Sequence, residues 1–250
     1  MSANPLILEN ICRVEEQFAA ACTRAGRSRN DVKLMAVSKT QPVEAIAEVF
    51  GAGLRLFGEN RVQEFQQKSP ALKALNIHVA SGGVPTEGEA HVHLIGHLQS
   101  NKTSRAAEIF SAVDTVDSLK LAQRLHEAAS GLNRCLPVLI EMKLSQEETK
   151  TGLAPNSPEL TELLERMPDL SHLQLKGLMA VAPLDENPET ARQCFRRLSE
   201  LRNQLTTQYP KLDFSELSMG MSGDFEIAIE EGSTQVRIGT AIFGARPKPA

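Results

Sequence analysis

The amino-acid sequence predicts an α/β fold: a closed TIM-type (β/α)8 barrel of parallel strands, preceded by an N-terminal helix. Short apolar runs, typical of strands covered on both faces, alternate eight times with segments in which apolar residues recur at helical spacing. Eight such units in 250 residues match the usual length of this barrel. An open, doubly wound sheet is the alternative, but no glycine-rich dinucleotide turn follows the first strand.

The first helix and the first strand set this pattern. Apolar residues recur at helical spacing over residues 5–25, and Gly26 ends this helix. Residues 32–39 follow as the first strand, because their centre is an unbroken apolar run. Pro42 then fits the first turn of a helix near 43–51.

The remaining units repeat the alternation. The expected strands are 54–58, 91–95, 112–116, 136–144, 173–181, 214–219 and 235–238. The expected helices are 61–75, 101–110, 118–129, 188–208 and 222–231, with one more that Ser157 caps and Pro158 opens. Residues 81–89, rich in glycine and proline, are expected to form an exposed loop. No change of composition separates a second domain, so residues 1–250 are expected to form one domain.

Composition argues against several classes of partner. The formal net charge is −4 and the chain has one tyrosine and no tryptophan, so neither a basic surface nor an aromatic platform for nucleic acid is expected. No apolar run is long enough to span a membrane, and the N-terminus lacks the core of a signal peptide. Four scattered cysteines indicate reduced thiols, so we expect a cytoplasmic protein.

Chemistry is expected at the mouth, the end of the barrel where the carboxyl ends of the strands meet. Lys39 ends the first strand, where a partly desolvated amine would have a lowered pKa and could form a Schiff base with a carbonyl. The plain alternative is a lysine that reaches solvent. Asn60 follows the second strand, where its amide could orient a ligand oxygen or cap the next helix.

Small residues after the last two strands predict a phosphate site. Ser222 follows the seventh strand, and Gly239 with Thr240 follows the eighth. Backbone N–H groups can approach an anion closely at such residues, and barrels often bind phosphate at these two strand ends. Helix capping is the alternative for Ser222, and a tight bend is the alternative for Gly239.

Arg237 lies inside an apolar strand and therefore needs a buried partner. An anion, a ring nitrogen or a carboxylate such as Glu59 would serve. A lysine amine, a phosphate site and a buried arginine at one mouth together describe a site for a phosphorylated aldehyde. Pyridoxal 5′-phosphate (PLP) has all three matching groups.

A metal site is the competing interpretation for His91 and His93. Their alternation places two imidazoles on one face of a strand. No companion carboxylates appear at the other strand ends, and His91 is expected at the start of its strand, away from the mouth. We therefore expect no metal.

Seven segments spread over most of the chain resemble one family. They are AVSKT (36–40), FGENRVQE (57–64), HLIGHLQSNK (93–102), KTGL (150–153), KGLMAV (176–181), LSMGMSGD (217–224) and AIEEGSTQVRIGTAIFGAR (228–246). Together they resemble the pyridoxal phosphate homeostasis proteins, the YggS/PROSC group, which are similar to the N-terminal domain of alanine racemase. Two features depart from the family: Val92 replaces an aromatic residue, and 81–89 looks like an insertion.

The resemblance implies a barrel of PLP fold type III without the C-terminal β domain of alanine racemase. The residues it implies in cofactor binding are Lys39, Asn60, Ser222, Arg237, Gly239 and Thr240. It implies PLP bound covalently at Lys39, and Arg237 facing the pyridine nitrogen. An arginine there keeps the nitrogen unprotonated and weakens electron withdrawal by the ring.

The implied function is PLP homeostasis. We expect a monomer that holds PLP or delivers it to PLP-dependent apoenzymes, affects amino-acid and keto-acid balance, and is not an enzyme. A racemase of restricted activity is the alternative, but it needs a second acid or base, usually a tyrosine, and Tyr209 follows a long helix away from the mouth. A class I aldolase that uses Lys39 without a cofactor is the third hypothesis.

Overall fold

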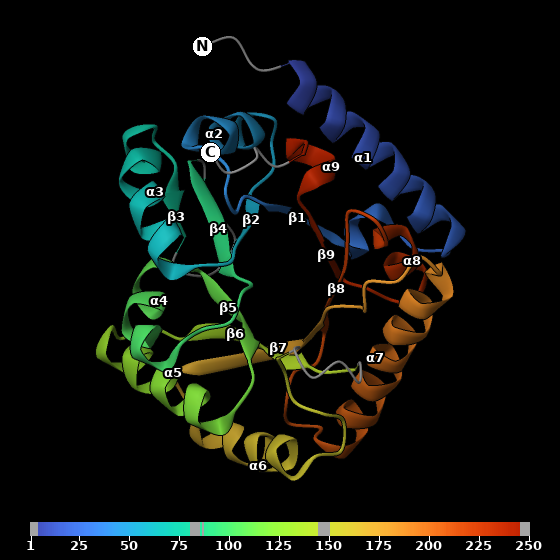
Figure 1. Cartoon of the computed structure of the whole chain (residues 1–250). Helices are drawn as coiled ribbons and strands as arrows, with labels where there is room; N and C mark the ends of the chain where they lie inside the picture. The colour runs from blue at the N-terminus through green and yellow to red at the C-terminus, as the bar shows by residue number, and fades with distance from the viewer. Residues whose placement is uncertain (1–4, 81–85, 87, 145–150, 246–250) are drawn as a thin grey trace.

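Eight parallel strands close into a barrel surrounded by helices in the computed structural model (Figure 1). The structure describes residues 5–80, 86, 88–144 and 151–245. The barrel strands are β1 (Lys33–Val37), β2 (Leu56–Glu59), β4 (Glu89–Leu94), β5 (Ala112–Val116), β6 (Leu136–Met142), β7 (Leu173–Ala180), β8 (Glu216–Met221) and β9 (Gln235–Ile238). Neighbours along the chain pair in parallel, β1 pairs with β9, and β2 pairs with β4. These pairings complete the ring, so the predicted closed barrel is confirmed.

The strand boundaries lie within two residues of those expected. The first strand ends early because the amide of Gln41 donates to the carbonyl of Ser38, which starts a turn. Lys39 therefore lies on this turn, just past the strand, rather than inside it.

A short strand, β3 (His78–Val79), was not predicted because two residues are too few to show a pattern. It pairs in parallel with the first residues of β4. As a result β4 begins at Glu89, inside the segment expected to be a loop, and His91 lies within the strand rather than at its start. Residues 81–85 and 87 of that expected loop lie outside the described residues.

The helices are α1 (Pro5–Arg24), α2 (Val43–Gly51), α3 (Val62–Ala74), α4 (Thr103–Ile109), α5 (Leu119–Gly131), α6 (Pro158–Arg166), α7 (Pro188–Gln208), α8 (Phe225–Glu230) and α9 (Thr240–Phe243). The expected cap of α6 is confirmed, because the hydroxyl of Ser157 accepts from the amide of Leu160. The largest boundary difference among the helices is in α8, which begins three residues later than expected because Ser222 and Gly223 form a turn. Among the described helices, none combines the length and apolar character that crossing a membrane requires.

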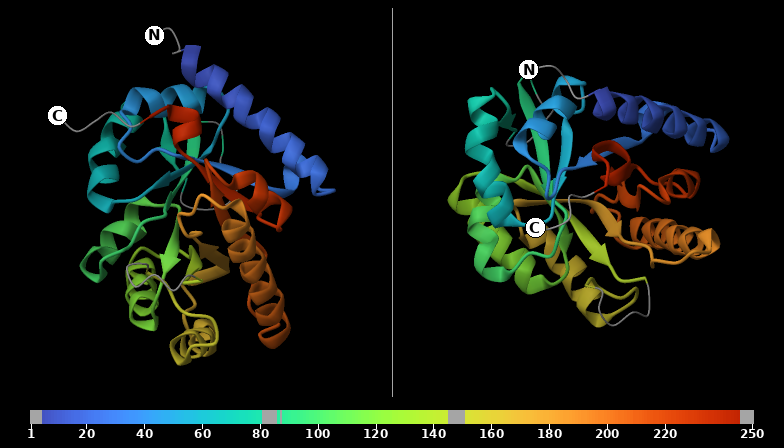
Figure 2. Two further views of the ribbon diagram at one scale, coloured as in Figure 1. Left: turned by 45° about the vertical axis from the view of Figure 1, so that its right-hand side comes forward. Right: turned by 45° about the horizontal axis from the view of Figure 1, so that its top comes forward.

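The first helix packs on the outside of the barrel, beside α8 and α9 (Figure 2). The side-chain amide of Asn10 donates to the backbone carbonyl of Ile242 over 3.0 Å. At the other end of α1, Arg24 forms ion pairs with Glu226 and Glu230 of α8. The helix thus holds the two segments that follow β8 and β9 against the barrel wall.

The core has an apolar outer layer and a polar centre. Between strands and helices, the rings of Phe65 and Phe110 are fully buried with centroids 5.1 Å apart. Inside the barrel, Asp114 of β5, Ser218 of β8 and Gln235 of β9 are each at most 1% exposed. Gln235 donates to Asp114 although β5 and β9 are not neighbours in the sheet, so this contact crosses the barrel interior.

Candidate functional site

The structure brings the predicted site residues to the mouth of the barrel. Lys39 follows β1, Asn60 follows β2 and Ser222 follows β8. Gly239 and Thr240 follow β9, and Arg237 lies in β9 two residues earlier. Because all eight strands are parallel, these ends share one side of the molecule.

Both neighbours of Lys39 are held by side chains from the next β/α unit. The hydroxyl of Ser38 donates to Glu59 Oε1 over 2.8 Å, and its carbonyl accepts from Lys68 Nζ over 2.9 Å. The amide of Thr40 donates to Glu64 Oε1. Lys39 itself is half-buried. Its backbone is therefore fixed on both sides.

Lys68 is the centre of this clamp, which we define as Ser38, Thr40, Glu59, Glu64 and Lys68. Its Nζ lies 2.9 Å from Glu59 Oε1 and 2.6 Å from Glu64 Oε1, and its side chain is only 11% exposed. Burial raises the pKa of Glu59, although Lys68 and Ser38 act against it. Burial also acts to raise the pKa of Glu64, but hydrogen bonds from Lys68 and Thr40 outweigh it and lower that pKa.

The clamp also holds an uncommon backbone conformation. Thr40 has a φ of 64°, in the left-handed region that a β-branched residue rarely adopts. Sequence reasoning missed Lys68 and Glu64; the one signal was their spacing of four residues on a helix, which allows an ion pair.

Arg237 is 5% exposed and binds the protein through three contacts. Its Nη1 donates to the carbonyl (2.7 Å) and the hydroxyl (2.8 Å) of Ser218, and its Nη2 donates to the carbonyl of Ala180 (2.8 Å). A guanidinium carries five N–H groups, so two take no part in these three contacts. The alternative of an ion pair with Glu59 is wrong, because Glu59 is instead bound by Lys68 and Ser38.

Ser222 joins the segments that follow β8 and β9. Its Oγ accepts from the amides of Gly239 (3.2 Å) and Ala241 (3.3 Å). A hydroxyl that accepts twice still has its own hydrogen to donate. The prediction that Ser222 caps the helix that follows it, α8, is wrong, since α8 begins at Phe225 and Asp224 takes the cap position.

The two glycines beside Ser222 leave room for a ligand. A Cβ added to Gly223 would meet nothing within 4 Å, and one added to Gly239 would touch only Val37, at an ordinary 3.5 Å. Packing within the protein therefore does not demand glycine at position 239. The amide of Gly239, expected to bind phosphate, is engaged by Ser222.

Asn60 presents a buried acceptor at the mouth. Among the described residues, no donor reaches its Oδ1, and the cap position of α3 belongs to Arg61. Leaving a buried polar atom without a partner costs about 1–3 kcal/mol, so a ligand donor there would be stabilised. A cleft of about 350 Å³ lies beside it, between the segments that follow β2 and β4, and is lined by His97 and Lys102.

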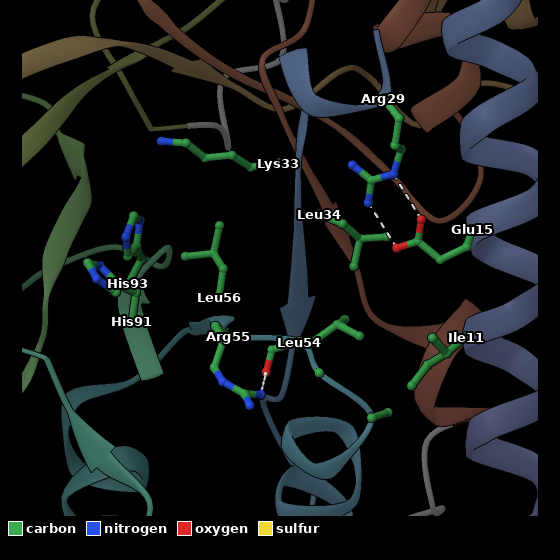
Figure 3. Close-up of a pocket in the computed structure, with 12 residues that line it drawn as sticks. Ile11, Glu15, Arg29, Lys33, Leu34, Leu54, Arg55, Leu56, His91 and His93 are labelled. Atoms are coloured by element: carbon green, nitrogen blue, oxygen red, sulfur yellow. Dashed lines mark hydrogen bonds and ion pairs between the residues drawn. The ribbon is translucent and has the colours of Figure 1, made fainter. Parts of the chain in front are cut away.

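A larger cavity, of about 590 Å³, lies at the opposite end of the barrel (Figure 3). Lys33 lines it from the start of β1 and pairs with Glu216 at 2.6 Å. Arg29 pairs with Glu15 at 2.9 Å. The charges of these residues are thus matched within the protein, and the cavity contains none of the predicted site residues.

The two alternating histidines make other contacts. His93 Nδ1 lies 3.1 Å from Asp114 Oδ1, and the rings of His91 and His93 are 6.3 Å apart. Within the described ranges, no group of three His, Cys, Asp or Glu side chains is placed to hold a metal ion.

Comparison with known proteins first defines the class. Residues 11–247 match the family described as "Alanine racemase, N-terminal domain". Alanine racemase from Clostridium difficile superposes with a TM-score of 0.72, over 97% of this chain and 57% of that one. At 16% identity this likeness shows the fold alone. The class is therefore a barrel of the alanine racemase N-terminal type.

Closer relatives define the family. The chain is 43% identical over 238 residues to the pyridoxal phosphate homeostasis protein of Aquifex aeolicus (95% of this chain, 97% of that one). It is 41% identical over 240 residues to the protein of that name from Escherichia coli (96% and 97%). PipY of Synechococcus elongatus, solved with PLP bound, superposes with a TM-score of 0.78 at 37% identity (92% and 100%). The chain belongs to the family of pyridoxal phosphate homeostasis proteins.

Proposed function

We propose that this protein binds PLP at the mouth of the barrel and acts in PLP homeostasis, as a carrier or regulator that affects amino-acid and keto-acid balance. The observation that carries the proposal is that one mouth gathers a half-buried lysine, a hydroxyl with a hydrogen to donate and an arginine with two N–H groups to spare. The names of the relatives and the PLP-bound PipY structure support it.

Each residue fits a different part of the cofactor. Lys39 would hold PLP covalently through its amine. The hydroxyl of Ser222 would donate to a phosphate oxygen, with Gly239 and Thr240 beside it. Asn60 would line the pocket next to the ring.

Arg237 would set the electronic character of the site. Bound PLP supplies an electron-withdrawing ring, and this effect is strongest when the ring nitrogen is protonated. A guanidinium donates a hydrogen bond but does not give up its proton. Arg237 would therefore leave the nitrogen unprotonated, which suits a carrier better than a catalyst.

We further propose that the protein is a cytoplasmic monomer and not an enzyme, and that it delivers PLP to apoenzymes. The only tyrosine, Tyr209, follows α7 and precedes β8, and segments that enter strands lie at the end of the barrel opposite the mouth. It is thus far from Lys39 as a second acid or base. None of the four cysteines forms a disulfide, which supports a reducing compartment.

The visible absorption spectrum after addition of PLP tests the proposal. The wild type is expected to bind one PLP and to show the band of a cofactor bonded to lysine, and Lys39→Ala is expected to lose it. Lys33→Ala is the matched control, because it removes the lysine at the other end of β1 and should keep the band. A wild type without the band would refute PLP binding.

The same loaded preparations separate transfer from turnover. Incubation with the apo form of a PLP-dependent enzyme is expected to restore that enzyme's activity. Incubation with L-amino acids is expected to leave their chirality unchanged. If the wild type racemises an amino acid and Lys39→Ala does not, the racemase function is supported and the carrier function is refuted.

A further inference from the structure

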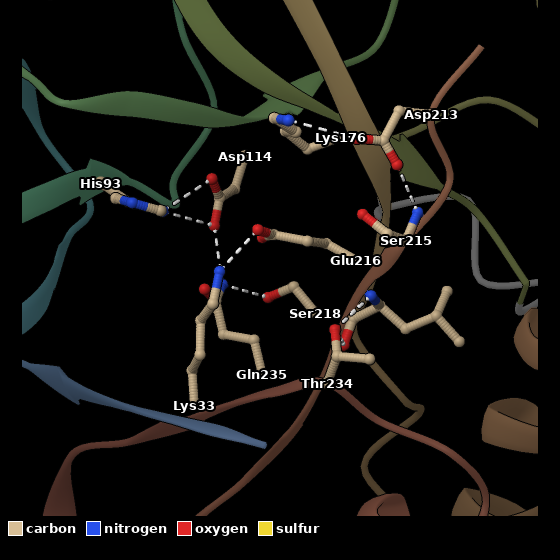
Figure 4. A network of polar contacts seen from close by, with 11 residues as sticks. Lys33, His93, Asp114, Lys176, Asp213, Ser215, Glu216, Ser218, Thr234 and Gln235 are labelled. Atoms are coloured by element: carbon tan, nitrogen blue, oxygen red, sulfur yellow. Dashed lines mark hydrogen bonds and ion pairs between the residues drawn. The ribbon is translucent and has the colours of Figure 1, made fainter. Parts of the chain in front are cut away.

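A chain of buried polar contacts runs through the barrel interior and ends on Arg237. Figure 4 shows its part from His93 to Ser218. Asp114 Oδ1 lies 3.1 Å from His93 Nδ1, and Asp114 Oδ2 accepts from Gln235 Nε2 over 3.0 Å. The same Nε2 donates to Ser218 Oγ over 3.0 Å. Ser218 Oγ in turn accepts from Arg237 Nη1 over 2.8 Å. The chain thus joins four strands, β4, β5, β8 and β9, across the barrel.

The orientation of the Gln235 amide depends on Asp114. A carboxylate only accepts hydrogen bonds, so it must face the NH2 group of the amide and not its oxygen. The opposite orientation would set two acceptors against each other. With the NH2 group fixed in this way, its second hydrogen reaches Ser218, which also accepts from Arg237.

Arg237 also needs a negative charge, and no carboxylate touches it directly among the described residues. Burial lowers the pKa of its guanidinium, and the carboxylates of Asp114, Asp224 and Glu141 act against this, with Asp114 first. Asp114 is 1% exposed, so its charge is poorly screened by water. Asp114 and Arg237 are therefore linked by the hydrogen bonds of Gln235 and Ser218 and not by a direct ion pair.

We propose that Asp114 is a positioning residue for PLP binding: through Gln235 and Ser218 it orients the guanidinium of Arg237 and balances its charge. This inference rests on the proposed function, because it assigns Arg237 to the cofactor ring. Neither Asp114 nor Gln235 lies at the mouth, so both act only through Arg237.

The test compares PLP affinity and the absorption maximum of the bound cofactor in variants confirmed as folded by thermal melting. Asp114→Asn removes the charge but keeps the shape, and Gln235→Met breaks the relay but keeps the charge. Each variant is expected to weaken PLP binding by about tenfold or more, which corresponds to the free energy of about one hydrogen bond to a charged group. Each is also expected to shift the absorption maximum of the bound cofactor. Asp213→Asn is the matched control, because its partner is Lys176, outside the chain of contacts.

A double-mutant cycle decides whether Asp114 acts through Arg237. If it does, Asp114→Asn will have little further effect on PLP affinity once Arg237→Met is present. A merely structural role would lower the melting temperature in both backgrounds and leave the absorption maximum unchanged. That result would overturn the proposal.

The outcomes also separate this inference from the proposed function. If the wild type does not bind PLP, the proposed function fails and the inference fails with it. If the wild type binds PLP and both variants bind it equally well, only the inference fails. Should Asp114→Asn not fold, Gln235→Met decides alone, and an unchanged affinity in that variant refutes the relay.

Discussion

At the scale of single residues, the structure shows how a lysine on a turn is held in place. Lys39 lies between Ser38 and Thr40, and both are bound by the clamp around Lys68. A flexible turn would let the amine sample many positions, whereas a fixed backbone reduces the entropy lost when a ligand binds. The clamp residues therefore matter for the site although they are not predicted to touch PLP.

Lys68→Met is expected to destabilise the protein and to weaken PLP binding. The variant leaves the buried Glu59 carboxyl without its cationic partner, a loss of about 3–5 kcal/mol for a buried pair. It also releases the carbonyl of Ser38. Denaturant unfolding and PLP titration measure the two effects.

Lys73→Met is the control for this prediction, because Lys73 is an exposed lysine in the last turn of the same helix. Lys73→Met should change neither the free energy of unfolding nor the PLP affinity measurably. Equal PLP affinity in Lys68→Met and the wild type would show that the clamp does not position Lys39.

At the scale of elements, the site depends on how closely two strand ends approach each other. The amide of Ile95, just past β4, donates to the carbonyl of Glu59 at the end of β2. A Cβ on Gly96 would then collide with the backbone of Asn60. Glycine at position 96 thus lets the two segments meet, which sets the position of Asn60.

Gly96→Ala is expected to push Asn60 outward, to weaken PLP binding several-fold and to destabilise the protein by about 1–3 kcal/mol, as overpacking does. Gly51→Ala is the matched control, since a Cβ there meets nothing within 4 Å. PLP titration and thermal melting check both variants. Unchanged affinity in Gly96→Ala would mean that the backbone of Asn60 is not a constraint on the site.

At the scale of the whole molecule, buried and half-buried carboxyls couple stability to pH. Burial raises the pKa of Glu59, Glu141 and Asp224. The folded protein therefore keeps these protons at pH values where the unfolded chain has released them. Their contribution to stability is complete below the ordinary carboxyl range, about pH 4, and is lost as the pH rises through each raised pKa.

Glu141→Gln is expected to remove one part of this dependence. Glu141 Oε1 accepts from Thr151, while Oε2 is buried without a partner among the described residues. The variant should gain stability relative to the wild type as the pH rises above about 4, until Glu141 is fully ionised. Free energies of unfolding from pH 4 to 8 measure this gain. The exposed Glu162→Gln is the control, and parallel pH curves for all three proteins would contradict the prediction.

The sequence by itself determined the barrel, most element boundaries and the residues at the strand ends. These follow from local periodicity and from the rule that parallel strands share one mouth, so the sequence alone places Lys39 and Ser222 there. Short strands such as β3 are too short to show a periodic pattern and were therefore not predicted.

Only the tertiary structure decided which side chains hold the site residues. Gln235 meets Asp114 across 121 positions of sequence, and Lys68 reaches the carbonyl of Ser38 from a helix. It also decided that Arg237 binds Ser218 and Ala180 rather than Glu59, and that Ser222 binds amides at the start of α9 rather than capping α8. The physical reason is that periodicity fixes which face of an element is buried, whereas a hydrogen-bond partner depends on strand register and on distances across the barrel.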